Sequence, residues 1–124
     1  MKKLLIADDE EGVRSLVRMT LESEDYEILE AADGKQALEM VRAHRPDLVL
    51  LDVMMPEMDG LEACRAIKGD ESTASTTVVL LTAKAQEADL QSGWDAGADD
   101  YFTKPFSPVA LLRKVGEVFE EKSE

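Results

Sequence analysis

Two short, continuously apolar segments limit most strongly what this chain can fold into. Residues 48–51 read LVLL and residues 78–81 read VVLL, without the alternating polar residues that mark a half-exposed strand. Strands that are apolar on both faces are typical of a parallel sheet covered by helices on both sides. The two segments therefore predict the central strands of such a sheet.

The change between strand and helix periods organises the rest of the chain. Strands are predicted at residues 4–7, 26–31, 48–51, 78–82 and 100–103. Helices are predicted from Val13 to Leu21, from the N-cap Asp33 to a point before Pro46, at about 61–68, at 87–96, and from Pro108 after a Ser107 cap. Five strand–helix units indicate a three-layer α/β domain, and this pattern leaves the strand order open.

The last two helices carry more specific expectations. Leu112, Val115 and Phe119 are predicted to form the buried face of the last helix. The helix at 87–96 has the weakest apolar stripe and contains Ser92 and Gly93. We therefore expect it to be the most mobile of the five helices.

Length and cysteine content favour one domain in a reducing compartment. The 124 residues fit a single domain, residues 1–124, with 120–124 as a frayed tail or the start of a linker. Cys64 is the only cysteine, so no internal disulfide can form and a cytoplasmic location is expected. The first apolar run is only four residues long before Asp8, which predicts neither an export signal nor a membrane span.

The charge of the chain restricts its partners. There are 27 acidic and 14 basic residues, which gives a formal net charge of -13. Such a surface repels the phosphate backbone of nucleic acids. Cations and basic protein surfaces are the expected partners.

Polar side chains follow four of the five predicted strands. The first strand leads into Asp8 and Asp9, the third into Asp52, the fourth ends at Thr82, and the fifth leads into Lys104. In an open parallel sheet the ligand site lies beyond the carboxyl ends of the strands, so these groups should converge there. Three neighbouring carboxylates repel one another unless a cation lies among them, and an all-oxygen set suits Mg²⁺.

Each of these residues also has an ordinary structural explanation. Asp8 and Asp9 could cap a helix, and Thr82 and Lys104 could be unremarkable loop residues. Taken one at a time, such residues are more often structural than functional. Their joint occurrence at four strand ends favours a site.

Four sequence motifs carry a resemblance that covers almost the whole chain. They are IADDE at 6–10, LLDVMMPEMDG at 50–60, VVLLTA at 78–83 and GADDYFTKPF at 97–106. With them the chain resembles the receiver domain of bacterial two-component response regulators. The resemblance implies a flavodoxin-like parallel sheet of strand order 2-1-3-4-5. It also implies a cis peptide bond between Lys104 and Pro105.

The resemblance also implies roles for the residues at the strand ends. Asp52 is expected to accept a phosphoryl group from the phosphohistidine of a sensor histidine kinase or a histidine phosphotransfer protein. The implied Mg²⁺ ligands are the carboxylates of Asp8, Asp9 and Asp52 and the main-chain carbonyl of Met54. Thr82 and Lys104 resemble the pair that contacts the phosphoryl oxygens, and Tyr101 resembles the aromatic switch residue.

Two side chains are expected to set how long the phosphoryl group persists. Met54 and Lys84 each lie two residues beyond a site residue, at positions that resemble those at which the family tunes hydrolysis. An apolar Met54 cannot orient a water, and Lys84 could crowd its approach or simply point into solvent.

The expected function is a phosphorylation-dependent switch that changes the face made by the fourth helix, fifth strand and fifth helix. The output is expected to pass to an effector protein or to a C-terminal output domain. The domain is expected to be no enzyme but a phosphoryl acceptor that assists its own phosphorylation and dephosphorylation. A degenerate receiver that acts as a scaffold would lack part of the site. An aspartate-nucleophile phosphatase would need an acid where Met54 stands.

A few other residues are expected to have no part in the chemistry. His44 is read as an ordinary helix-end residue and Cys64 as a small core residue. Met54, Met55 and Met58 could fill gaps in the core or form a soft partner surface, and the sequence leaves both possibilities open.

Overall fold

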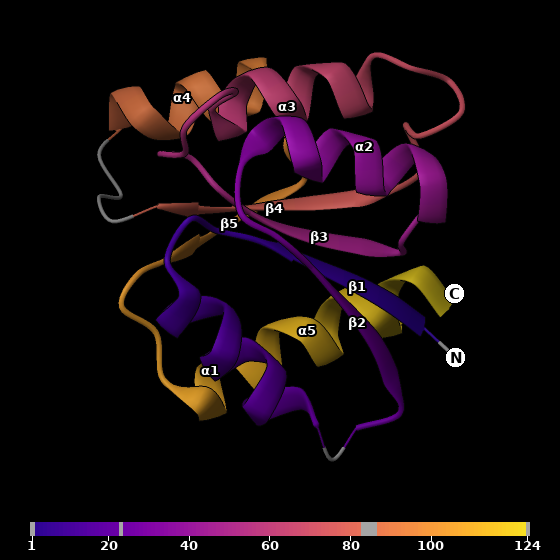
Figure 1. Ribbon diagram of the computed structural model, residues 1–124, viewed down its shortest axis with the longest axis vertical. Helices are drawn as coiled ribbons and strands as arrows, with labels where there is room; N and C mark the ends of the chain where they lie inside the picture. The colour runs from indigo at the N-terminus through magenta and orange to yellow at the C-terminus, as the bar shows by residue number, and fades with distance from the viewer. Residues whose placement is uncertain (1, 23, 83–86, 124) are drawn as a thin grey trace.

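The fold alternates strands and helices along the whole chain (Figure 1). The computed structural model describes residues 2–22, 24–82 and 87–123, with the side chains of 87–90 and 121–123 left out. The strands are β1 (Lys2–Ala7), β2 (Tyr26–Ala31), β3 (Leu48–Asp52), β4 (Thr77–Thr82) and β5 (Asp100–Thr103). The helices are α1 (Glu11–Leu21), α2 (Gly34–His44), α3 (Gly60–Lys68), α4 (Glu87–Asp95) and α5 (Pro108–Ser123).

All neighbouring strands pair in parallel, in the order β2-β1-β3-β4-β5. Helices α2, α3 and α4 cover one face of the sheet, and α1 and α5 cover the other (Figure 1). This arrangement confirms the three-layer α/β prediction and the strand order implied by the family resemblance.

The apolar strands divide their side chains between two cores. Successive side chains of a strand point to opposite faces, so Leu48 and Leu50 pack against α1 and α5 while Val49 and Leu51 pack toward α2 and α3. Each of these four residues is fully buried. Burial of one such side chain stabilises a fold by about 1.5–3 kcal/mol, so β3 is a firm support for the residue at its end.

The buried face of α5 differs from the prediction. Leu111, Val115 and Phe119 are buried, whereas Leu112 is 36% exposed. Residues four apart lie on one side of a helix, so Leu111 shares a face with Val115 and Phe119, and Leu112 is rotated away from it. The choice of Leu112 as the first core residue of this helix was wrong.

Most element boundaries lie within a residue or two of those predicted. Strand β1 begins two residues earlier, α3 and β4 begin one residue earlier, and α4 ends at Asp95 rather than at residue 96. The predicted caps are confirmed, since Asp33 accepts a hydrogen bond from the Gln36 amide at 2.7 Å and Ser107 accepts one from the Ala110 amide at 3.1 Å. The expected mobility of α4 stays a prediction.

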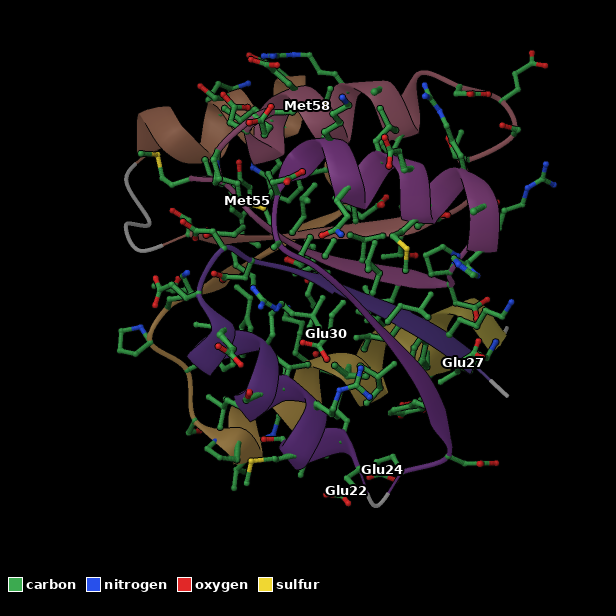
Figure 2. All side chains as sticks on the ribbon, in the orientation of Figure 1. Glu22, Glu24, Glu27, Glu30, Met55 and Met58 are labelled. Atoms are coloured by element: carbon green, nitrogen blue, oxygen red, sulfur yellow. The ribbon has the colours of Figure 1, made fainter. Side chains whose placement is uncertain are left out.

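The methionines that follow β3 separate into two kinds. Met55 and Met58 are partly buried and pack against the core under α2 and α3 (Figure 2). Met54 is 78% exposed.

Two further residues lie as the sequence predicted. Cys64 is buried in the same core, and His44 ends α2 with its side chain exposed. Within the described ranges, no helix is long and apolar enough to cross a membrane.

The loop after β3 passes very close to the start of α2. A Cβ atom built on Gly34 would lie 1.8 Å from the main-chain oxygen of Met58, whereas one built on Gly12, at the start of α1, meets nothing within 4 Å. Main-chain atoms cannot move aside as a flexible side chain can. Gly34 therefore fixes the distance between α2 and the loop that carries the residues after Asp52.

Gly34→Ala is expected to lower the free energy of unfolding by at least about 2 kcal/mol, because the new methyl group overlaps the main chain of the loop. Urea unfolding of the variant measures this loss. Gly12→Ala is the matched control and should be neutral or stabilising by up to about 1 kcal/mol, because alanine favours the helix. Equal effects of the two substitutions would contradict the close-contact explanation.

Candidate functional site

A cleft opens at the carboxyl edge of the sheet. It has a volume of ≈ 500 Å³, and residues from several strand ends line it, among them Asp9, Glu10, Asp52, Thr82, Tyr101 and Lys104. These residues are far apart in sequence and meet because the strands are parallel. The cleft lies at the edge where the sequence placed the site.

The turn after β1 contributes a group of carboxylates. Asp8 is fully buried, while Asp9 and Glu10 are exposed, and ligand atoms of all three lie within 4.8 Å of one another. The Glu10 amide donates to Asp8 Oδ1 at 2.9 Å, which holds the turn closed. The sequence reasoning gave Glu10 no role, although its place directly after two aspartates was a signal that it would share their surroundings.

Lys104 joins this group to the end of β3. Its ammonium lies 3.0 Å from Asp8 Oδ2, 3.5 Å from Asp52 Oδ1 and 3.9 Å from Glu10 Oε1. The Lys104 amide donates to the Thr82 carbonyl at 2.8 Å, and the bond to Pro105 is cis, as the resemblance implied. Burial alone lowers the pKa of Lys104, but the Asp8 hydrogen bond and the nearby carboxylates outweigh it, and the net pKa is raised.

Asp52 is the last residue of β3 and is only 4% exposed. Its main-chain neighbours are fixed, because the Val53 amide donates to Leu81 and the Gly60 amide donates to Val53. Burial and the Asp8 carboxylate raise the pKa of Asp52 to about 6, although Lys104 opposes this rise. The buried strand thus places an easily protonated carboxylate at a fixed point in the cleft.

The other side of the cleft is formed by β4, β5 and α4. Thr82 ends β4 and is buried, and Ser92 of α4 also lines the cleft. Tyr101 packs edge-to-face on Trp94, with ring centroids 5.0 Å apart. A Cβ atom on Gly93 would overlap the Tyr101 hydroxyl, so a glycine at this position lets the tyrosine lie directly against α4. The sequence predicted neither this contact nor a place for Ser92 in the cleft.

The remaining expected residues are placed as follows. Met54 lines the cleft from the loop after β3 with its side chain largely exposed. Lys84, expected to influence the lifetime of a phosphoryl group, lies outside the described residues. Asp52 is not one of the three acids that lie within 4.8 Å of one another, and its link to them is the Lys104 ammonium.

The donor chemistry of the cleft fits a hard divalent cation. The ligand atoms are carboxylate oxygens, which Mg²⁺ prefers over nitrogen or sulfur ligands. Asp9 and Glu10 are exposed toward solvent, so a hydrated ion can reach them. The pKa of Asp52 is raised mainly by burial and then by the Asp8 carboxylate, and a cation beside these two carboxylates would favour their ionised forms.

A parallel α/β sheet with an acidic cleft at its carboxyl edge is the architecture that the sequence resemblance implied. The family model for the response regulator receiver domain matches residues 4–116. The chain therefore belongs to the receiver domains of two-component response regulators, which act in signal transduction.

Solved structures and curated relatives agree with this assignment. The chemotaxis response regulator CheY4 of Vibrio cholerae superposes with a TM-score of 0.90 at 35% identity, covering 95% of this chain and 98% of that one. The beryllofluoride-activated receiver domain of DrrB gives a TM-score of 0.86 at 35% identity, covering 97% of this chain and 98% of that one.

The chain spans about half the length of the curated relatives it matches. It is 43% identical to the alkaline phosphatase synthesis transcriptional regulatory protein PhoP of Bacillus subtilis, over 92% of this chain and 47% of that protein. It is also 43% identical to the phosphate regulon transcriptional regulatory protein PhoB of Pseudomonas aeruginosa, over 94% of this chain and 51% of that protein. Both relatives are named as transcriptional regulatory proteins.

The raised pKa of Asp52 predicts a pH-dependent cost to stability. The folded chain keeps the Asp52 proton up to about pH 6, whereas an ordinary aspartate, with a pKa of 3.8, releases it earlier. The folded state therefore binds more protons between these values, and stability falls as pH rises through this window. One pKa unit corresponds to about 1.4 kcal/mol, so the ionised Asp52 destabilises the fold by about 2–3 kcal/mol.

Asp52→Asn should therefore raise the unfolding free energy in chelator at pH 8 by about 2 kcal/mol and have little effect at pH 4. Denaturant unfolding at the two pH values tests this. Asp25→Asn, which removes an exposed acid in the turn before β2, is the control and should change stability little at either pH. The same stability for Asp52→Asn and the unaltered chain at pH 8 would contradict the assigned cause.

Proposed function

We propose that this domain is a phosphorylation-dependent switch in which Asp52 accepts a phosphoryl group from the phosphohistidine of a sensor histidine kinase or a histidine phosphotransfer protein. The observation that carries the proposal is the position of Asp52. It is a buried carboxylate at a strand end, 3.5 Å from the Lys104 ammonium, in a cleft open to a partner. Its pKa of about 6 leaves it ionised, and so nucleophilic, at neutral pH.

The transfer needs positioning and charge neutralisation more than acid–base chemistry. An Asp52 oxygen forms the new bond to phosphorus while the bond from phosphorus to the donor imidazole nitrogen breaks. Lys104 lies close enough to Asp52 to neutralise a phosphoryl oxygen, and the Thr82 hydroxyl can donate a hydrogen bond to another. A buried strand holds Asp52, so the nucleophile itself needs little reorganisation during transfer.

The acids at the end of β1 are the proposed support for Mg²⁺. Asp8, Asp9 and Asp52 would hold the ion together with the Met54 carbonyl, and Glu10 lies close enough to take part through water. When bound, Mg²⁺ neutralises charge that builds up on the transferred group. Since the ion would compensate the Asp8 and Asp52 carboxylates, it should also stabilise the fold.

The proposed response starts at Thr82 and travels toward α4. Movement of Thr82 toward the phosphoryl group would open space for Tyr101, which packs on Trp94 of α4. The face formed by α4, β5 and α5 would then change its shape for a partner. Such a change is a shift between two packings that both exist before phosphorylation.

Met54 and Lys84 are the proposed residues that set the lifetime of the aspartyl phosphate. The Met54 side chain lines the cleft two residues after Asp52 and offers no hydrogen bond to orient a hydrolytic water. Lys84 is assigned from its place in the sequence alone, two residues after Thr82.

The proposed output is protein-mediated. PhoP and PhoB are named as transcriptional regulators, and this chain covers about half of each. We place any nucleic-acid contact outside this domain, because its net charge of -13 repels nucleic acid. The output would act through a separate effector protein or an attached output domain.

Two alternative functions are less well supported. A scaffold without phosphorylation does not account for a cleft in which Asp52, Thr82 and Lys104 are all present. An aspartate-nucleophile phosphatase needs a second acid where this chain has Met54.

Acetyl phosphate with Mg²⁺ should add one phosphoryl group to the chain, and intact-mass measurement should detect it. Asp52→Asn and chelation should each abolish the adduct, because the first removes the nucleophile and the second removes the cation. Asp59→Asn changes a nearby aspartate that caps α3 and should leave the adduct unchanged. An adduct of equal yield on the Asp52→Asn chain would refute the assignment.

Trp94 should report the switch, because it touches Tyr101 and is the only tryptophan. Mg²⁺ and beryllofluoride are expected to change its fluorescence, and Asp52→Asn should abolish the change. Tyr101→Leu should reduce the response without preventing beryllofluoride binding, which ¹⁹F NMR can follow. An unchanged Trp94 signal on a chain shown to bind beryllofluoride would exclude α4 from the response.

A further inference from the structure

An arginine of α1 contacts the acidic turn from outside the cleft. Arg14 Nη1 donates to the main-chain carbonyl of Asp8 at 2.7 Å. The Arg14 side chain is 17% exposed, so this bond is largely shielded from water. It reaches the peptide that joins Asp8 to Asp9, the two aspartates on which the proposed metal site depends.

Asp8 has a partner for each of its polar groups. Its amide donates to the Ala31 carbonyl at 3.1 Å, and its two carboxylate oxygens accept from the Glu10 amide and from Lys104. The fourth group, the carbonyl, accepts from Arg14. Among these partners, Arg14 is the one side chain that lies outside the cleft.

Glu30 of β2 holds Arg14 in place. Its Oε1 atom lies 3.2 Å from Arg14 Nε, and its Oε2 atom lies 2.8 Å from Arg18 Nε. Glu30 sits on the edge strand beside α1 (Figure 2). One carboxylate thus pairs with two arginines on successive turns of the same helix.

The two arginines differ in the carbonyl that each one contacts. Arg18 Nη2 donates to the Ile28 carbonyl in β2 at 3.1 Å, away from the cleft, whereas Arg14 contacts Asp8. Both tie α1 to β2 through Glu30, so both should support the fold. Only Arg14 continues to the acidic turn.

We propose that Arg14, oriented by Glu30, is a positioning residue for the Asp8–Asp9 turn and so for the metal site. The inference deepens the proposed function and rests on it. A fixed Asp8 carbonyl fixes the plane of the peptide bond between Asp8 and Asp9. The orientation of that peptide sets the direction in which the exposed Asp9 side chain leaves the main chain. Outer groups that orient metal ligands commonly change metal affinity by a factor of about 10–100.

The geometry requires a guanidinium at this position. Arg14 uses Nε for Glu30 and Nη1 for the carbonyl of Asp8, two donors of one rigid planar group. A lysine ammonium carries the same charge on a single nitrogen atom and cannot reproduce this fork. Charge alone is therefore not sufficient to hold the turn.

The test compares Mg²⁺ affinity with stability in Arg14→Met and Arg18→Met. Isothermal titration with Mg²⁺ alone gives the affinity, and thermal unfolding in chelator gives the stability. Both variants should lose stability because both lose an ion pair with Glu30. Arg14→Met should bind Mg²⁺ about tenfold more weakly, whereas Arg18→Met should stay within twofold of the unaltered chain.

Two conservative variants keep the test decisive if Arg14→Met folds poorly. Compared with Arg14→Met, Arg14→Lys should recover less than half of the lost Mg²⁺ affinity on a logarithmic scale. Glu30→Gln should weaken Mg²⁺ binding by about threefold, because Arg14 is then less firmly held. At saturating Mg²⁺ all variants should accept a phosphoryl group from acetyl phosphate at nearly the unaltered rate. That result would separate loss of metal positioning from loss of transfer chemistry.

Each contrary result identifies which proposal fails. Equal losses of Mg²⁺ affinity in Arg14→Met and Arg18→Met would reduce Arg14 to a structural residue and overturn the inference. Full rescue by Arg14→Lys would also overturn it, because charge alone would then be enough. An unaltered chain that binds no Mg²⁺ would overturn the proposed function together with this inference.

Discussion

Repulsion between carboxylates at one edge of the sheet is the constraint on which the rest of the structure depends. Asp8 and Asp52 are buried side by side, and Lys104 lies within 3.5 Å of both. This ammonium connects the loop after β5 to β1 and β3, so the charge balance of the site also fixes the far end of the sheet. Burial, together with the Asp8 carboxylate, still raises the pKa of Asp52 to about 6. A site that buries neighbouring carboxylates attracts a cation and lowers stability at the same time.

The two cores make that cost tolerable. Strand β3 is buried along its whole length, and burial of its four apolar side chains exceeds the unfavourable energy of an ionised Asp52. The same burial keeps the strand end rigid, which suits the role proposed for Asp52, because the nucleophile in a phosphoryl transfer must already be in line. Packing energy and chemical positioning therefore come from the same residues.

The sequence predicted the layers, the strands and the convergence of Asp8, Asp9, Asp52, Thr82 and Lys104, because short-range periodicity and one topological rule are sufficient for those. It missed contacts that depend on how elements rotate about their own axes. The choice of Leu112 over Leu111 is one example, and the pairing of Arg14 with both Glu30 and the Asp8 carbonyl is another. The strand order came from family resemblance, since the apolar pattern suits several arrangements of five parallel strands.

The bond between Lys104 and Asp8 joins residues 96 positions apart. During synthesis Asp8, which follows β1, and Asp52, which ends β3, therefore emerge long before the lysine that compensates them. In the proposed switch, a nascent chain that has reached only β4 carries the acceptor Asp52 but lacks the Lys104 ammonium that would compensate its charge. On this proposal signalling competence arrives only with the residue after the last strand, so an unfinished chain would not compete with finished receivers for phosphoryl groups.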